Sequence, residues 1–278
     1  SRSDHTYLNP DKRENYLFSS SIKGIEESDF IFLIGSNPRY EATILNARIR
    51  KSYLQNKTKI ISLNDVGDLT YPYEALDGSI ENIKNITEDK HKISKLIKEA
   101  KKPLIIFGQS ALKISSAKYL FESIKSFLKK NNKISKEWNS LNVISENASS
   151  VGSFDLGLYK TEDGSNEVLK DLENNKFEIV YLLGQDNLRF NKQNEFIIYQ
   201  GSHGDKGAEM ADIILPGAAY TEQNGYFTNL EGKLQKAYKA SYPPEESKED
   251  WLIINELAEV MNHRKLFNDK DELDSSLL

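Results

Sequence analysis

The chain of 278 residues contains no cysteine. Disulfide bonds, thiolate zinc sites and iron–sulfur clusters held by cysteine are therefore excluded from this chain. Histidine is also scarce, because His5, His91, His203 and His263 are the only four. No two of them have the spacing of a metal-binding motif such as H-x-x-x-H. The sequence thus predicts no metal site.

Long hydrophobic runs and an excess of basic charge are absent as well. No apolar stretch approaches the roughly 18–20 residues that a transmembrane helix needs, so we expect no direct membrane insertion. Lysine and arginine number 37 against 42 aspartate and glutamate, a formal net charge of -5, and the two signs are interleaved. No basic face is expected, so nucleic-acid binding is not predicted. A polar start without Met or an apolar leader is typical of a processed chain or a piece of a longer one.

The sequence does contain several short apolar runs, and some of them are followed directly by a glycine. Continuous apolar runs of this length predict strands that are buried on both faces, as in a parallel sheet. We expect strands at residues 30–34, 59–63, 103–107, 179–183, 196–199 and 213–215.

Helices are predicted between these strands from apolar residues at helical spacing. Ser247 and Asp250 resemble a capping box before the last helix, whose predicted core stripe is Trp251, Ile254, Leu257 and Met261. The other expected helices lie at residues 38–53, around 93–100, up to about 130, at 138–148 and at 168–172.

Strands that alternate with helices indicate an α/β fold with Rossmann-like, mainly parallel sheets in two lobes. A turn-rich connector at residues 64–78 suggests a lobe boundary near residue 75. We therefore expect a partial first α/β lobe at residues 1–75, a second α/β lobe at 76–262 and a loosely held polar tail at 263–278.

A first candidate site is the strand-to-helix junction Gly35-Ser36-Asn37-Pro38. Its free backbone N–H groups could bind an anion. The pattern lacks G-x-G-x-x-G and has no acidic residue at the dinucleotide-binding spacing. A helix start, with an N-cap and a proline in the first turn, explains the same residues.

A second candidate lies in the stretch Glu195–Gln235, whose loop from Gly201 to Gly207 has glycine at every third position. The loop could hold a phosphate, with His203 and Asp205 as an acid/base pair. The alternative is a loop whose glycines permit positive φ, with a closing turn at Asn224-Gly225. No nucleophile motif accompanies the loop, so we assign no catalytic, cofactor-binding or metal-binding residues.

Several long strings carry a resemblance to a known family. They are residues 24–56 (GIEESDFIFLIGSNPRYEATILNARIRKSYLQN), 68–71 (DLTY), 100–103 (AKKP), 197–205 (IIYQGSHGD), 211–222 (ADIILPGAAYTE), 229–233 (NLEGK) and 249–251 (EDW). In this order they resemble the large iron–sulfur subunit, of the 75-kDa class, of respiratory complex I, the NADH:ubiquinone oxidoreductase. The resemblance covers about residues 15–262.

The same strings resemble, more distantly, the molybdopterin oxidoreductase superfamily of the formate dehydrogenase and DMSO reductase type. In that superfamily a Gly-Ser-Asn-Pro turn and an Asn-x-Glu-Gly-Arg region frame a pterin dinucleotide, whereas this chain has Lys233 in place of the arginine. The resemblance implies the C-terminal, molybdopterin-oxidoreductase-like half of the complex I subunit, with the fold kept and the molybdopterin lost.

For function, the resemblance implies a structural component of the peripheral arm of complex I, without redox chemistry of its own. The enzyme would be the whole NADH:ubiquinone reductase. The implied partners are other peripheral-arm subunits, above all the cluster-bearing half of the same subunit, which would hold the iron–sulfur clusters. The implied place is the matrix side of the mitochondrial inner membrane, or the cytoplasmic face of the inner membrane in bacteria.

Two other functions remain open on the sequence. One is a fragment of an active molybdopterin oxidoreductase, which would need a Cys, Ser or Asp ligand to molybdenum. The other is an independent nucleotide-binding α/β module that uses the junctions at Gly35 and Gly201.

Overall fold

A computed structural model of the chain divides it into two compact units. Unit 1 comprises Ser1–Asn166 and Phe227–Gln235, and unit 2 comprises Glu167–Tyr226 and Lys236–Leu278. The structure describes residues 7–145, 147–148, 150–158, 168, 171–185, 190–204 and 206–277.

Unit 1 is built on a five-stranded parallel sheet with the strand order β3-β2-β1-β4-β5. This is the order of the first five strands of a Rossmann fold, as the alternating pattern predicted. Every residue of β1 and β4 is buried, which explains why these strands read as continuous apolar runs. The strands are β1 (Phe30–Ile34), β2 (Lys59–Leu63), β3 (Glu74–Leu76), β4 (Pro103–Phe107) and β5 (Leu141–Val143).

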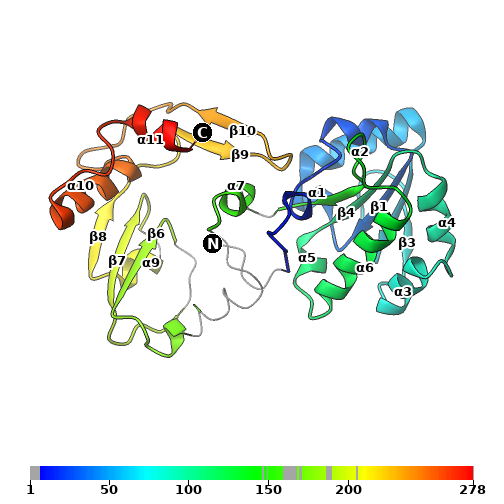
Figure 1. Cartoon of the computed structure of the whole chain (residues 1–278), viewed down its shortest axis with the longest axis horizontal. Helices are drawn as coiled ribbons and strands as arrows, with labels where there is room; N and C mark the ends of the chain where they lie inside the picture. Colours follow the sequence, from blue (N-terminus) through cyan, green and yellow to red (C-terminus); the bar gives the residue numbers. More distant parts are fainter. Residues whose placement is uncertain are drawn as a thin grey trace. The chain divides into compact units, whose positions relative to one another are not determined.

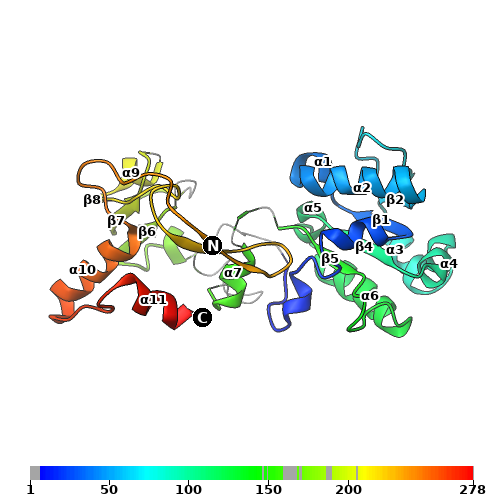
Figure 2. The same cartoon turned by 90° about the horizontal axis from the view of Figure 1, so that it is seen from above.

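Helices cover both faces of this sheet (Figure 1). Because side chains alternate along a strand, one face of β1 presents Phe32 to a core with α3, α4 and α6, and the other presents Ile31 to a core with α2. Figure 2 shows α1 and α2 on the opposite side of the strands from α6. The helices are α1 (Pro38–Glu41), α2 (Thr43–Asn56), α3 (Ile80–Thr87), α4 (Lys92–Glu99), α5 (Gln109–Leu112), α6 (Ala117–Lys130) and α7 (Ser150–Asp155), with 3-10 turns η1 (Arg13–Asn15) and η2 (Lys23–Glu27).

Three predictions for this unit need correction. The helix expected at residues 38–53 is interrupted at Ala42, whose φ of -154° is extended, and continues as α2. The helix expected at 138–148 is wrong, because Leu141–Val143 pair with β4 as a strand. The lobe boundary expected near residue 75 falls inside β3, which pairs with β2. The helix at 138–148 and the boundary near residue 75 are both contradicted by strand pairing, which cannot be seen in the local periodicity of the sequence.

Unit 2 contains the three-stranded parallel sheet β6-β7-β8, with β7 in the centre. Its strands confirm the three predicted ones. The helix predicted at 168–172 lies partly outside the described residues. The elements are β6 (Ile179–Leu183), β7 (Phe196–Gly201), α9 (Lys206–Met210), β8 (Ile213–Pro216), α10 (Asp250–Asn262) and α11 (Lys270–Leu277). The strands β9 (Gly225–Thr228) and β10 (Leu234–Ala237) form a separate two-stranded sheet, of which Phe227–Gln235 belongs to unit 1.

The end of the chain also differs from expectation. The tail predicted as loosely held contains α11, whose Asp274 is buried and accepts a hydrogen bond from Lys236 at 3.3 Å. The predicted capping box is absent, because the N-cap of α10 is Glu249 and its side chain makes no cap bond. Gly225 begins β9 instead of closing a turn. No helix in the described part of the chain is long and apolar enough to cross a membrane.

Two loops at the carboxyl edge of the unit 1 sheet touch through glycines. Gly35 follows β1 and Gly108 follows β4. A Cβ atom on Gly108 would lie 2.2 Å from the Gly35 carbonyl oxygen and 2.5 Å from the Ser36 Cα atom. The Gly108 N–H donates to the Ile34 oxygen at 3.0 Å, and the Ser110 hydroxyl donates to the Gly35 oxygen at 2.6 Å. Only glycine at position 108 permits this approach.

We predict that Gly108→Ala lowers the free energy of unfolding by about 1–3 kcal/mol, because the added methyl group meets backbone atoms that have no room to move. Gly204→Ala is the matched control, since a Cβ atom there meets nothing within 4 Å, and it should change stability by less than about 1 kcal/mol. Urea unfolding followed by circular dichroism measures both. Equal effects of the two substitutions would contradict the close packing.

Candidate functional site

The strand order of unit 1 defines where a ligand would bind. The chain runs from β1 to β2 and β3 on one side and to β4 and β5 on the other. In open parallel sheets the ligand crevice opens where the order reverses, at the carboxyl ends of the two central strands. Here these strands are β1 and β4, so the predicted junction Gly35–Pro38 lies at the expected place.

This crevice is closed by the chain itself. The contact between Gly35 and Gly108 fills the space between the two loops, and a Cβ atom on Gly35 would lie 2.5 Å from Ala111. The Asn37 N–H, which would face an anion, donates to the Glu41 carboxylate at 2.7 Å. Asn37 is the N-cap of α1, and its side chain accepts from the Arg39 N–H at 3.2 Å. Glu41 therefore takes the place that an anionic ligand would occupy.

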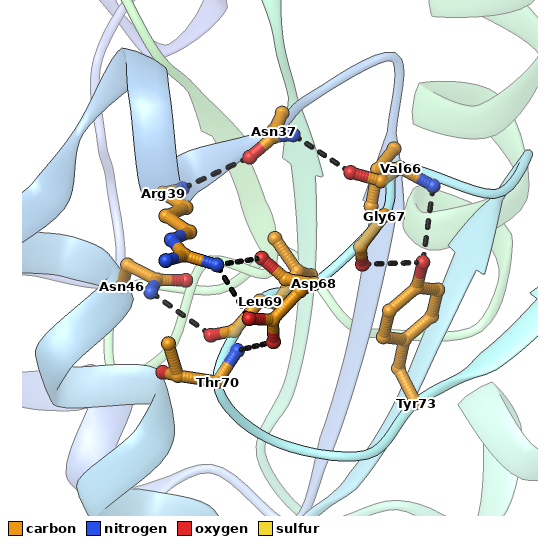
Figure 3. A network of polar contacts seen from close by, with 9 residues as sticks. All are labelled: Asn37, Arg39, Asn46, Val66, Gly67, Asp68, Leu69, Thr70 and Tyr73. Carbon is orange, nitrogen blue, oxygen red and sulfur yellow. Dashed lines mark hydrogen bonds and ion pairs between the residues drawn. The ribbon is translucent and has the colours of Figure 1, made fainter.

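Side chains of α1 and α2 fasten the loop after β2 beside this junction (Figure 3). Arg39 binds the carboxylate of Asp68 at 2.6 Å. The Asn37 amide donates to the Val66 oxygen at 2.8 Å, and the Asn46 amide donates to the Leu69 oxygen at 3.1 Å. The Thr70 N–H and Arg39 together lower the pKa of Asp68, as charge-assisted hydrogen bonds do. The cation nearest the junction is thus already paired.

The glycine-rich loop after β7 makes room for an aromatic ring. A Cβ atom on Gly201 would lie 2.2 Å from the Tyr199 hydroxyl oxygen, and one on Gly207 would lie 2.8 Å from the Tyr199 ring. The Tyr199 hydroxyl donates to the His203 carbonyl oxygen at 2.9 Å. The expectation of positive φ is wrong for Gly201, Gly204 and Gly207. Close approach of the Tyr199 ring requires glycine at the first and last of these positions.

The structure describes one of the two residues of the candidate acid/base pair. His203 is exposed, and its Nδ1 atom lies 2.9 Å from the Ser202 hydroxyl, while Asp205 lies outside the described residues. His91 caps α4 by accepting the Ile93 N–H at 3.2 Å. Across the described residues, no cluster of three or more His, Asp or Glu side chains has a geometry that could hold a metal ion.

The Asn229–Lys233 loop between β9 and β10 is a second polar centre of unit 1. Asn229 shapes it, since its side-chain oxygen accepts from the N–H groups of Glu231 at 3.0 Å and Lys233 at 2.9 Å. The Glu231 carboxylate accepts the Ile22 N–H at 2.7 Å and pairs with Lys233 at 2.9 Å. Burial raises the pKa of Glu231, but these bonds outweigh it and hold the pKa below its ordinary value.

An ion-pair network ties the same loop to α7. Arg13 donates through Nε and Nη2 to the Asp155 carboxylate, both at 2.9 Å, and through Nη2 to the Gly232 oxygen at 2.7 Å. The Tyr16 hydroxyl donates to Asp155 at 2.8 Å, and its ring stacks on Phe154 with 4.7 Å between centroids. Burial and the Asp155 carboxylate raise the pKa of Tyr16 to about 12. Sequence reasoning missed this network, because its members stand up to 219 positions apart.

The sequence of this chain is similar to a known protein family and to several known proteins. The model of the family "Molybdopterin oxidoreductase" matches residues 1–260. The NADH-ubiquinone oxidoreductase 75 kDa subunit of Reclinomonas americana is 39% identical over 98% of this chain. An NADH-quinone oxidoreductase subunit of Rickettsia bellii is 38% identical over 97%, and the mitochondrial NADH-ubiquinone oxidoreductase 78 kDa subunit of Candida albicans is 37% identical over 93%.

The chain spans only part of each relative, namely 39%, 38% and 35% of their lengths. Among solved structures, the acetylene hydratase of Pelobacter acetylenicus is similar with a TM-score of 0.58, over 94% of this chain and 49% of that one. At 12% identity this likeness shows the fold alone. The family model, which covers nearly the whole chain, and the shared α/β fold agree: the chain belongs to the molybdopterin oxidoreductase family.

Proposed function

We propose that the chain is a structural component of the peripheral arm of respiratory complex I, corresponding to part of its large subunit. The observation that carries this proposal is the identity of 37–39% over nearly the whole chain to complex I subunits of bacteria and mitochondria. The chain would contribute to electron transfer from NADH to quinone by packing against the polypeptide that holds the iron–sulfur clusters.

The residue content supports a role without redox chemistry in this chain. Iron–sulfur clusters are held mainly by cysteine thiolates, and the sequence has no cysteine. The clusters of the assembled enzyme would therefore lie in the remaining part of the subunit or in its neighbours. The chain would sit with them on the matrix side of the mitochondrial inner membrane, or on the cytoplasmic face in bacteria.

The pterin cofactor that the family name implies does not fit the residues present. A dinucleotide at the carboxyl edge of β1 and β4 needs open space and free N–H groups. The contact between Gly35 and Gly108 fills that space, and the Asn37 N–H already donates a hydrogen bond to Glu41. Glu231 is likewise engaged, by the Ile22 N–H and Lys233. The proposed function therefore involves no reaction at molybdopterin.

The proposed function predicts that the chain co-migrates with NADH dehydrogenase activity on a native gel of detergent-solubilised membranes. An affinity tag at its carboxyl terminus should recover the activity, with iron and without stoichiometric molybdenum in elemental analysis. Recovery of the chain only as a free protein would contradict the proposal. One molybdenum atom per chain would instead support an active molybdopterin enzyme.

A second prediction concerns Glu231, whose contacts make it a structural link. Its pKa lies below the ordinary value of 4.5 in the folded chain, so its stabilising contribution is complete above pH 4.5 and is lost as the pH falls through the lower folded value. Glu231→Gln should lower stability at pH 7 by about 1 kcal/mol and flatten the loss of stability between pH 5 and the acid limit. Thermal unfolding at a series of pH values measures this.

Glu137→Gln, at an exposed position of the same unit, is the control and should leave the pH profile of stability unchanged. If stability depended on pH in the same way for Glu231→Gln and for the native chain, the structural role of this carboxylate would be contradicted.

A further inference from the structure

The two parallel sheets of this chain are covered to different extents. In unit 1 every residue of β1 and β4 is buried. In unit 2 several apolar strand residues are open to solvent: the exposed fraction is 63% for Ile179, 52% for Leu183 and 46% for Ile213. Parallel sheets occur almost only with both faces covered, so the second sheet lacks cover that its sequence is built to have.

The strand register places these exposed residues on one face. Ile179 pairs with Phe196, and Ile198 pairs with Ile213. Residues two apart point the same way, which groups the side chains into one surface across three strands. We call it the open face, and it consists of Ile179, Tyr181, Leu183, Phe196, Ile198, Ile213 and Leu215.

The opposite face carries the small core of this sheet, although Ile214 of the edge strand β8, which pairs with Tyr199, is 54% exposed there. Leu182, Ile197 and Tyr199 are buried there, with Ala208 and Met210 from α9 and its end packed against them. On the open face Gln200 is buried, and its amide donates to the Asp250 carboxylate of α10 at 2.8 Å. Tyr181 and Ile198 on the same face are partly buried. Among the described residues this cluster contains three buried apolar side chains, which is small for a sheet of three strands.

Helix α10 of unit 2 also leaves apolar side chains exposed. Its sequence predicts a core stripe, yet Ile254 is 36% exposed and Met261 is 70% exposed. The helix buries Ile253 and Ala258 instead. The predicted stripe is therefore wrong in part, and Ile254 and Met261 lie outside the face through which α10 packs.

We propose that the open face is the docking surface for the rest of the same subunit, namely the polypeptide that the complex I relatives carry beyond the region this chain matches. The chain spans only 35–39% of those relatives, each of which therefore carries a large additional stretch of polypeptide. The face of a parallel sheet is core-like, which calls for a permanent partner and not a transient one. This inference rests on the proposed function.

Site-specific photocrosslinking tests the inference on the whole chain. A benzophenone amino acid is placed at Leu183 on the open face, or at Leu54 on α2 of unit 1, whose exposed fraction of 54% matches the 52% of Leu183. In cells that assemble the complex, we expect an adduct from position 183 with the cluster-bearing polypeptide, identified by mass spectrometry. An adduct from position 183 with a second copy of this chain or only with another subunit would overturn the inference.

Charged substitutions at the same two positions give an independent measurement. Leu183→Asp should lower the amount of chain recovered with the complex at least about tenfold, because a carboxylate would be buried in an apolar interface. Leu54→Asp should leave recovery within about twofold, the range expected for a surface change. Circular dichroism of each isolated chain checks folding, and the crosslink at 183 decides the case if Leu183→Asp does not fold.

The outcomes separate this inference from the proposed function. If the native chain co-migrates with NADH dehydrogenase activity but Leu183→Asp is recovered equally well, the open face is not the docking surface and the proposed function stands. If the native chain does not co-migrate, the proposed function fails, and with it this choice of partner.

Discussion

The need of a parallel sheet for apolar cover on both faces is the constraint on which this structure depends. Unit 1 meets it with its own helices, α2 on one face and α3, α4 and α6 on the other. Unit 2 uses the same kind of strand but leaves the face through Leu183 and Ile213 exposed. Unit 1 therefore has a core on both faces of its sheet, whereas unit 2 has a core on one face only. Such an arrangement suits a chain that works only in association.

The chain's own carboxylates take the N–H groups that an anionic ligand would use. Glu41 accepts from Asn37 at the end of β1, and Glu231 accepts from Ile22 beside the hairpin loop. A carboxylate attached to the chain loses far less translational freedom on binding than a free phosphate does. It therefore competes well for these donors with a free anion at concentrations below about the millimolar range. The first contact occupies a donor at the expected ligand position, and the second fixes the hairpin loop.

Much of the fold could be predicted from the sequence, because five-residue apolar runs such as 30–34 and 103–107 indicate buried parallel strands without further context. The strand at Leu141–Val143 could not, since only pairing with β4 makes it a strand. The closed crevice was equally hidden, because it depends on how near Gly108 comes to Gly35. In the candidate loop, the spacing of glycines was visible, but the Tyr199 ring that explains it was not. Contacts between residues far apart in sequence leave no local pattern.

The closed crevice and the open face support the same conclusion. An enzyme that binds a dinucleotide must keep donors free for it, and each buried polar group left unpaired costs about 1–3 kcal/mol while the ligand is absent. A chain without that task gains stability by closing the crevice, as Gly35, Gly108 and Glu41 do here. The proposed function also needs a surface for association, and the apolar strands left exposed in unit 2 would provide one. The crevice at Gly35 and Gly108 is closed where a cofactor would bind. The open face of unit 2 stays apolar where we propose that a permanent partner binds.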